Sequence, residues 1–151
     1  MSAGSRPGGL TALAVINFVL CAFDLLGALG KGMALLAHRG VLPMSDEQRK
    51  NVAEVIVTLG EPAFVLQLAW DLACAVLLLP AGIGYIKMRR FLGRTVGNVY
   101  ALVSIGFAAT FFWLGGQQAG GVVGFAVLPM VIYPVLTLFL LNTTFKEDFV
   151  R

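Results

Sequence analysis

Charged residues are scarce in this sequence. Asp, Glu, Lys and Arg make up 13% of its 151 residues, whereas hydrophobic residues make up 58% and the mean hydropathy is +0.86. A soluble domain of this length needs far more polar residues to cover its surface. The shortage of charge therefore excludes an ordinary soluble domain and indicates that most of the chain lies in lipid.

The sequence also lacks the motifs that carry catalysis or hold a cofactor. It contains no nucleophile elbow, no phosphate-binding loop, no HExxH and no CxxC pair. We therefore expect no enzyme activity and no bound cofactor. The basic residues are scattered at the ends of apolar runs rather than gathered in one patch, so we expect no nucleic-acid partner either.

Cysteine is rare as well. The two cysteines, Cys21 and Cys74, both lie inside apolar runs. This placement excludes the dense disulfide framework of small secreted domains.

Four long apolar runs dominate what the sequence does contain. They cover residues 10–29, 63–85, 96–114 and 122–141. Each has about 19 to 23 residues, which gives a helix of about 28 to 35 Å, close to the hydrocarbon thickness of a bilayer. We predict an all-α membrane protein, a single domain over residues 1–151 built as a four-transmembrane-helix bundle, with an outer loop over residues 30–62.

The basic residues predict the orientation of these spans. With four spans, the two termini and the short basic loop 87–94 share one side of the membrane and carry most of the Lys and Arg residues. Because basic residues favour the cytoplasmic side, both termini are predicted to be cytoplasmic.

The outer loop contains a segment with the pattern of an amphipathic helix. Ser45 followed by Gln48 resembles a capping box, and apolar residues then recur at i, i+3, i+4 and i+7 opposite a polar face. These apolar residues are Val52, Val55, Ile56 and Leu59. The β-branched residues at 55–58 favour a short strand as the alternative. In either form the apolar face needs cover, so these four residues are candidates for contact with a partner.

Small residues recur at the spacing of helix contacts. Gly93 and Gly97 form one such pair, and Gly116, Gly120 and Gly124 form a series. Small residues at this spacing let helix backbones approach closely in a membrane. Besides the lipid bilayer, we therefore expect a protein partner, either further copies in a homo-oligomer or a larger membrane protein.

Two acidic residues inside the spans require an explanation, because a charge there costs about 2.5 to 3.5 kcal/mol on insertion scales. They are Asp24 and Asp71. If the first two spans pack as an antiparallel hairpin with their cytoplasmic ends matched, Asp24 lies opposite Asp71 and Cys21 lies opposite Cys74. The polar faces of these two helices are extended by Asn17, Lys31 and Gln67.

This arrangement allows three functional interpretations. Two carboxylates at one depth could share a proton or bind a cation on a conduction path. Asp24 and Asp71 with Cys21 and Cys74 could ligate a transition metal, although this set mixes hard and soft ligands and contains no histidine. The two cysteines could also form a disulfide.

A structural interpretation competes with these three. Asp24 would pair with Lys31 two turns above it, and Asp71 would bond the Gln67 amide or a partner helix. The two cysteines would then be small packing residues.

Two stretches of the chain carry a resemblance to a known group of proteins. Residues 6–18 (RPGGLTALAVINF) and 82–90 (GIGYIKMRR) resemble small four-helix inner-membrane proteins of bacteria, most of them uncharacterised. The resemblance implies a location in a bacterial inner membrane and supplies no catalytic residue.

The sequence is compatible with two functions. The first is a non-enzymatic membrane protein that acts as a self-assembling or accessory scaffold subunit. The alternative is a small ion or proton channel or transporter that uses Asp24 and Asp71.

Overall fold

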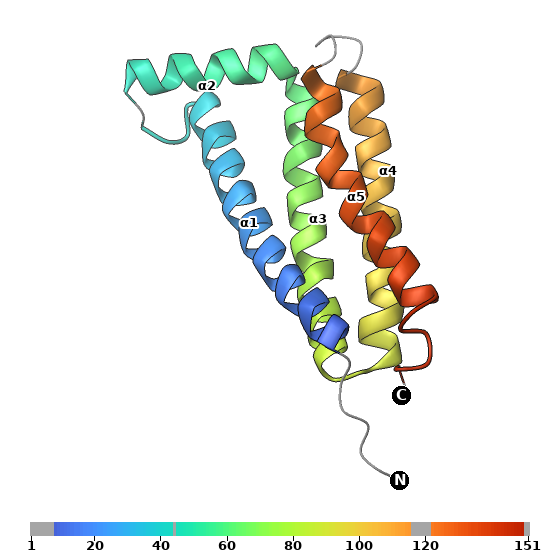
Figure 1. Cartoon of the computed structure of the whole chain (residues 1–151). Coiled ribbons are helices and arrows are strands. Elements are labelled where there is room, and N and C mark those ends of the chain that lie inside the picture. The colour runs from blue at the N-terminus through green and yellow to red at the C-terminus, as the bar shows by residue number, and fades with distance from the viewer. Residues whose placement is uncertain (1–7, 44, 116–121, 150–151) are drawn as a thin grey trace.

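The computed structural model describes residues 8–43, 45–115 and 122–149, and over residues 114–115 and 122–130 it describes the backbone. Within these ranges the protein is all-helical and has no strand (Figure 1). The elements in chain order are α1 (Gly8–His38), α2 (Asp46–Leu59), α3 (Glu61–Ile86), the π-helix η1 (Arg90–Thr95), α4 (Val96–Gly115) and α5 (Val122–Asn142). The predicted all-α class is confirmed. The alternative of a strand at residues 55–58 is wrong, because this segment lies inside α2.

Three helical segments are long and apolar enough to cross a membrane. They are Gly8–His38, Glu61–Ile86 and Arg90–Trp113. The first of these continues beyond the predicted span at residues 10–29, since residues 33–37 are all strong helix formers. With 31 residues, α1 is about 46 Å long, which exceeds the hydrocarbon thickness of about 30 Å.

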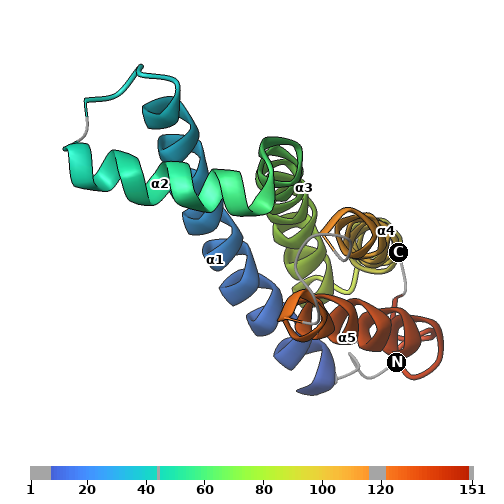
Figure 2. The same ribbon diagram turned by 90° about the horizontal axis from the view of Figure 1, so that it is seen from above.

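The long helices pack as two antiparallel hairpins. α1 pairs with α3 and α4 pairs with α5, while α3 also contacts α4 and so joins the two hairpins (Figure 1). α2 lies across one end of the bundle, roughly perpendicular to the long helices. In both views α1 leans away from α4 and α5 toward its C-terminal end (Figure 2).

Three clusters of buried residues follow the bundle from its N-terminal end to the end under α2. The first joins α1, α3, α5 and the segment after α5, and consists of Leu10, Leu13, Ala14, Ala81, Tyr85, Leu141, Phe145 and Phe149. The second joins α1, α3 and α4, and consists of Cys21, Cys74, Ala75, Leu78, Tyr100 and Ala101. The third cluster, formed by Ala63, Ala108 and Phe111, includes no described residue of α1. α1 therefore supplies its clustered core residues from its first half, and in its second half only Ala28 and Ala37 are buried.

Two of the predicted packing glycines lie at contacts within the chain. A Cβ on Gly84 would meet backbone atoms of Gly93, so α3 and η1 approach here as closely as two backbones can. A Cβ on Gly97 would meet the side chains of Tyr85 and Leu141. Both sites are therefore occupied by the protein's own helices.

The second predicted glycine series falls where little is described. Gly116 and Gly120 lie outside the described residues, and Gly124 belongs to α5 where the backbone is described. The role of this series in helix packing stays a prediction.

The predicted capping box opens α2. The Ser45 hydroxyl accepts a hydrogen bond from the Gln48 backbone N–H, and the Gln48 side-chain oxygen accepts one from the Ser45 N–H. Two backbone donors that the first helical turn leaves without partners are satisfied in this way.

The apolar face of α2 is covered in part by the chain itself. Ile56 is buried, and Val52 and Val55 line a cleft of about 280 Å³ between α2 and the facing parts of α1 and α3. Leu59 is partly buried at the end of the helix. Val55 and Val57 stay exposed, so a partner could still contact this edge of α2.

Candidate functional site

Asp71 on α3 is held by an ion pair with α1. Lys31 Nζ lies 2.6 Å from Asp71 Oδ2, and Asp71 is only 4% exposed. Gly27 makes room for this carboxylate, because a Cβ there would lie 3.0 Å from Asp71 Oδ2. The pair neutralises both charges and ties the outer halves of α1 and α3 together.

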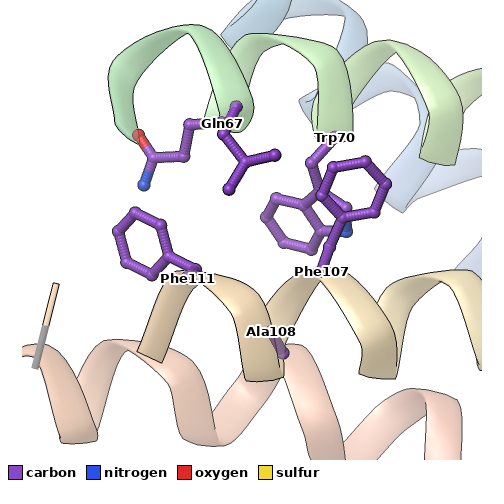
Figure 3. Close-up of a pocket in the computed structure, with 6 residues that line it drawn as sticks. Gln67, Trp70, Phe107, Ala108 and Phe111 are labelled. Atoms are coloured by element: carbon purple, nitrogen blue, oxygen red, sulfur yellow. The ribbon is translucent and has the colours of Figure 1, made fainter. Parts of the chain in front are cut away.

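The predicted pairing of Lys31 with Asp24 is therefore wrong. Of the two partners predicted for Asp71, the Gln67 amide is wrong, and a neighbouring helix, α1, supplies the partner instead. Lys31 and Asp24 lie two turns apart on one helix, about 10 Å along its axis, whereas Asp71 is reached directly across the α1–α3 contact. Gln67 lies in a different place, next to Phe111 of α4 (Figure 3).

The pocket around Gln67 is small and apolar. Trp70 and Phe107 line it together with Gln67 and Phe111 (Figure 3). Its volume of about 10 Å³ gives room for about one water. This pocket therefore lies within the contact between α3 and α4. Trp70 also lines a second, larger cavity.

The two cysteines point to different partners. Cys21 Sγ donates to the backbone oxygen of Ala75 at 3.4 Å, and Cys74 Sγ lies 3.8 Å from Ser104 Oγ on α4. Both thiols are free. The hairpin places Cys21 against Ala75, one residue beyond the predicted match, and the structure contains no bond between Cys21 and Cys74.

The described residues provide no cluster for a metal ion. Nowhere among them do three His, Cys, Asp or Glu side chains come together. The weak metal or redox interpretation of the cysteines and aspartates therefore has no geometric support in this part of the chain.

Asp24 lines a cavity of about 160 Å³ inside the bundle. Each of the four long helices contributes two lining residues, which are Leu20 and Asp24, Trp70 and Cys74, Tyr100 and Ser104, and Tyr133 and Pro134. Asp24 is the one charged side chain among them and is partly exposed. Within the described ranges it makes no hydrogen bond and no ion pair.

Aromatic side chains form much of the cavity wall. The rings of Tyr100 and Tyr133 pack at 55° with their centroids 6.2 Å apart. The Tyr133 hydroxyl donates a short hydrogen bond to Asn17 Oδ1, and Asn17 is fully buried. Asn17 therefore fixes the wall of the cavity, while the indole N–H of Trp70 has no hydrogen-bond partner in the described structure.

A layer of buried side chains lies between the cavity and the N-terminal end of the bundle. Leu10, Leu78, Tyr85 and Leu141 are all 0% exposed there. They come from α1, α3 and α5, so three helices meet at this floor. Apart from the Tyr85 hydroxyl, the side chains of the floor are apolar.

The sequence pattern named Asn17 and both aspartates but missed the aromatic wall. Tyr100 and Tyr133 lie on α4 and α5, and their position relative to Asp24 depends on how the two hairpins pack. One signal was present in the sequence, since tyrosine in spanning helices favours the membrane interface and Tyr133 lies in the middle of its apolar run. A tyrosine at mid-span indicates a polar partner inside the bundle.

Comparison with protein-family models, curated proteins and solved structures finds no match for this chain. Over the described residues, the fold and the site define an all-helical protein with three helices of membrane-crossing length and a largely apolar cavity between its helices that contains one carboxylate.

Proposed function

We propose that this chain is a small transporter or channel of a bacterial inner membrane that binds a cation or a proton at Asp24. In this proposal α5 is the fourth span, since it has 21 residues and an apolar sequence. The start of α1 and the end of α5 lie on the cytoplasmic side, because the basic segment 87–94, which runs into η1, lies at the same end of the bundle (Figure 1). α2 then lies on the outer surface of the membrane.

The environment of Asp24 carries this proposal. Among the acidic side chains of the long apolar helices, Asp71 has its cation at 2.6 Å and Asp24 has none. An ionised Asp24 leaves one negative charge without compensation inside the bundle, at a cost that a bound cation or proton removes. An acidic residue that only stabilised the fold would be expected to have a paired cation, as Asp71 has.

The cavity offers the means to hold such a cation. Ser104, Tyr100 and Tyr133 line the same cavity as Asp24, and the volume of about 160 Å³ admits several waters that could complete the shell of a cation. The apolar floor separates the cavity from the cytoplasmic end. Transport therefore requires a second conformation, and Pro134, which lines the cavity, removes one helical hydrogen bond from α5 and makes this helix easier to bend.

Flux through liposomes tests the proposal. The protein is reconstituted into vesicles that carry an internal pH-sensitive or potassium-sensitive dye, and Asp24→Asn is compared with the wild type. We expect Asp24→Asn to abolish flux while particle mass and helix content stay unchanged. Glu47→Gln, which removes an exposed carboxylate on α2, is the matched control and should conduct normally. Equal flux in Asp24→Asn and wild type would contradict the proposal.

A second candidate function is an accessory or scaffold subunit. The outer half of α1 leaves the core and presents large apolar side chains such as Phe23, Leu26 and Met33. A second copy or a larger membrane protein could pack against this surface, as lipid also can. In this case a polar substitution on this surface, such as Leu26→Ser, should change assembly, whereas Asp24→Asn should not, and the wild type should show no flux. The mass of the particle in nanodiscs, measured for wild type, Leu26→Ser and Asp24→Asn alongside the flux assay, separates the two functions.

A further inference from the structure

The cavity at Asp24 has the chemistry of a site for an organic cation. We propose that its ligand is a small organic ammonium ion, held by the Asp24 carboxylate on one side and by the rings of Trp70, Tyr100 and Tyr133 on the other. This inference rests on the proposed function, because it assumes that Asp24 binds a cation.

The wall opposite Asp24 is the first argument. α3, α4 and α5 each contribute one aromatic side chain to the cavity, while α1 contributes the carboxylate. A cation over aromatic faces is stabilised by about 0.5 to 2 kcal/mol per contact, and most strongly where water is excluded. Aromatic side chains around one cavity are a common means by which proteins recognise ammonium groups, and here a carboxylate lines the same cavity.

The size of the cavity is the second argument. Its volume of about 160 Å³ is at least about ten times the roughly 10 to 15 Å³ that one water needs in such a cavity. A bare inorganic ion would fill little of this space and would leave the rest to water. An ammonium carrying a few carbon atoms fills it and contacts the apolar residues Leu20 and Pro134 at its edge.

The supply of oxygen ligands is the third argument. Hard inorganic cations such as Ca²⁺ take about six to eight oxygen ligands. Here Asp24 supplies one carboxylate, the Tyr133 hydroxyl already bonds Asn17, and Ser104 lies next to the Cys74 thiol. This set suits a large cation of low charge density better than a small hard ion.

The neighbouring charges are compatible with a bound cation. Lys31 is the nearest basic side chain on α1, and its contact with Asp71 at 2.6 Å offsets its repulsion of a ligand. The Asp71–Lys31 ion pair therefore keeps Asp24 available. If Asp71 were removed, Lys31 would be free to turn toward Asp24 and compete with the ligand.

Trp70 provides a reporter inside the cavity. The chain has two tryptophans, and the other, Trp113, is 68% exposed near the end of α4. Replacing Trp113 by Phe leaves Trp70 as the single indole, so its fluorescence reports on the cavity. The full chain with Trp113→Phe is titrated with choline in maltoside micelles, which contain no ammonium group.

We expect a saturable change in Trp70 fluorescence with choline and no change with neohexanol, the uncharged carbon analogue of choline. Adding Asp24→Asn should weaken choline binding at least tenfold, and Asp24→Glu should restore part of it. Tyr100→Leu should bind choline more weakly than Tyr100→Phe, because only the phenylalanine keeps an aromatic ring. Glu47→Gln is the control for general loss of negative charge.

Two results would overturn the inference, and they differ in what they mean for the proposed function. If Na⁺, K⁺ or protons change the fluorescence in an Asp24-dependent way and choline neither changes it nor competes, the ligand is inorganic and the cation site stands. If none of these cations gives an Asp24-dependent signal, both proposals fail. Circular dichroism of each variant shows whether a lost signal reflects a lost fold.

Discussion

Asp24 and Asp71 are the same residue type on two helices of one hairpin, yet the structure gives them opposite surroundings. Asp71 is 4% exposed, lies 2.6 Å from Lys31 and fits a space that Gly27 leaves free. Asp24 is partly exposed, lines a cavity of about 160 Å³ and has no cation within bonding distance in the described structure. The difference comes from the facing helix. α1 supplies the Lys31 ammonium to Asp71, whereas no described residue supplies a cation to Asp24.

The largest difference between the two aspartates should appear in stability. Asp71→Asn leaves the Lys31 ammonium without its counter-ion, and breaking such a pair costs about 3 to 5 kcal/mol when both groups are buried. Because the Lys31 side chain is 25% exposed, we expect a loss of about 2 to 3 kcal/mol. Denaturant unfolding in micelles measures it. The double variant Lys31→Met with Asp71→Asn should recover most of the loss, and full stability of Asp71→Asn alone would show that the ion pair is not structural.

The wall of the Asp24 cavity should contribute more to stability than its carboxylate. Tyr133→Phe removes the hydrogen bond to Asn17 and leaves a fully buried acceptor unsatisfied, which should cost about 1 to 2 kcal/mol. Choline binding should persist, because the aromatic ring stays. Unfolding and Trp70 fluorescence are measured on one preparation, and a stable Tyr133→Phe variant that no longer binds choline would reverse this assignment.

The space beside Asp71 should tolerate only a small addition. In Gly27→Ala the new Cβ lies 3.0 Å from Asp71 Oδ2, so the carboxylate must shift, while alanine favours the helix by up to about 1 kcal/mol. We expect the two effects to nearly cancel, with a net loss of about 1 kcal/mol or less. The same substitution at Gly30, which has open space around it, is the matched control and should stabilise the protein. Equal effects at both positions would show that Asp71 has more room than the structure gives it.

The smallest stability effect is expected for Asp24 itself. Asp24→Asn removes a charge that has no partner, so stability should change by less than about 1 kcal/mol, with a gain as the favoured direction. Thermal unfolding in micelles without added cation measures this change. A loss as large as that of Asp71→Asn would mean that Asp24 holds the fold together and is not a ligand site.

Much of the fold could be predicted from the sequence because it depends on local patterns. The apolar runs predicted α1, α3 and α4, and Ser45 with Gln48 predicted the start of α2. The antiparallel match of the first two spans was off by one residue at Cys21, which bonds Ala75, and by three residues at Asp71, which faces Gly27 instead of Asp24. Helix length and loop position limit this register only to within about one helical turn.

The details of the site could not be predicted in the same way. Lys31 pairs with Asp71 and not with Asp24. This pairing depends on the direction in which one long, flexible side chain extends across the contact between two helices. The aromatic wall depends on the packing of the second hairpin against the first, which places Tyr100 and Tyr133 beside Asp24. The sequence orders residues along each helix but does not state which faces of distant helices meet.

Infrared difference spectroscopy of the carboxyl bands tests most directly whether Asp24, and not Asp71, is the cation site. Spectra of the protein in micelles are recorded before and after addition of choline or of K⁺, for the wild type, for Asp24→Asn and for the double variant Lys31→Met with Asp71→Asn. We expect a carboxyl difference band in the wild type and in the double variant, and none in Asp24→Asn. A band that persists in Asp24→Asn and disappears in the double variant would place the cation at Asp71 and contradict the central claim.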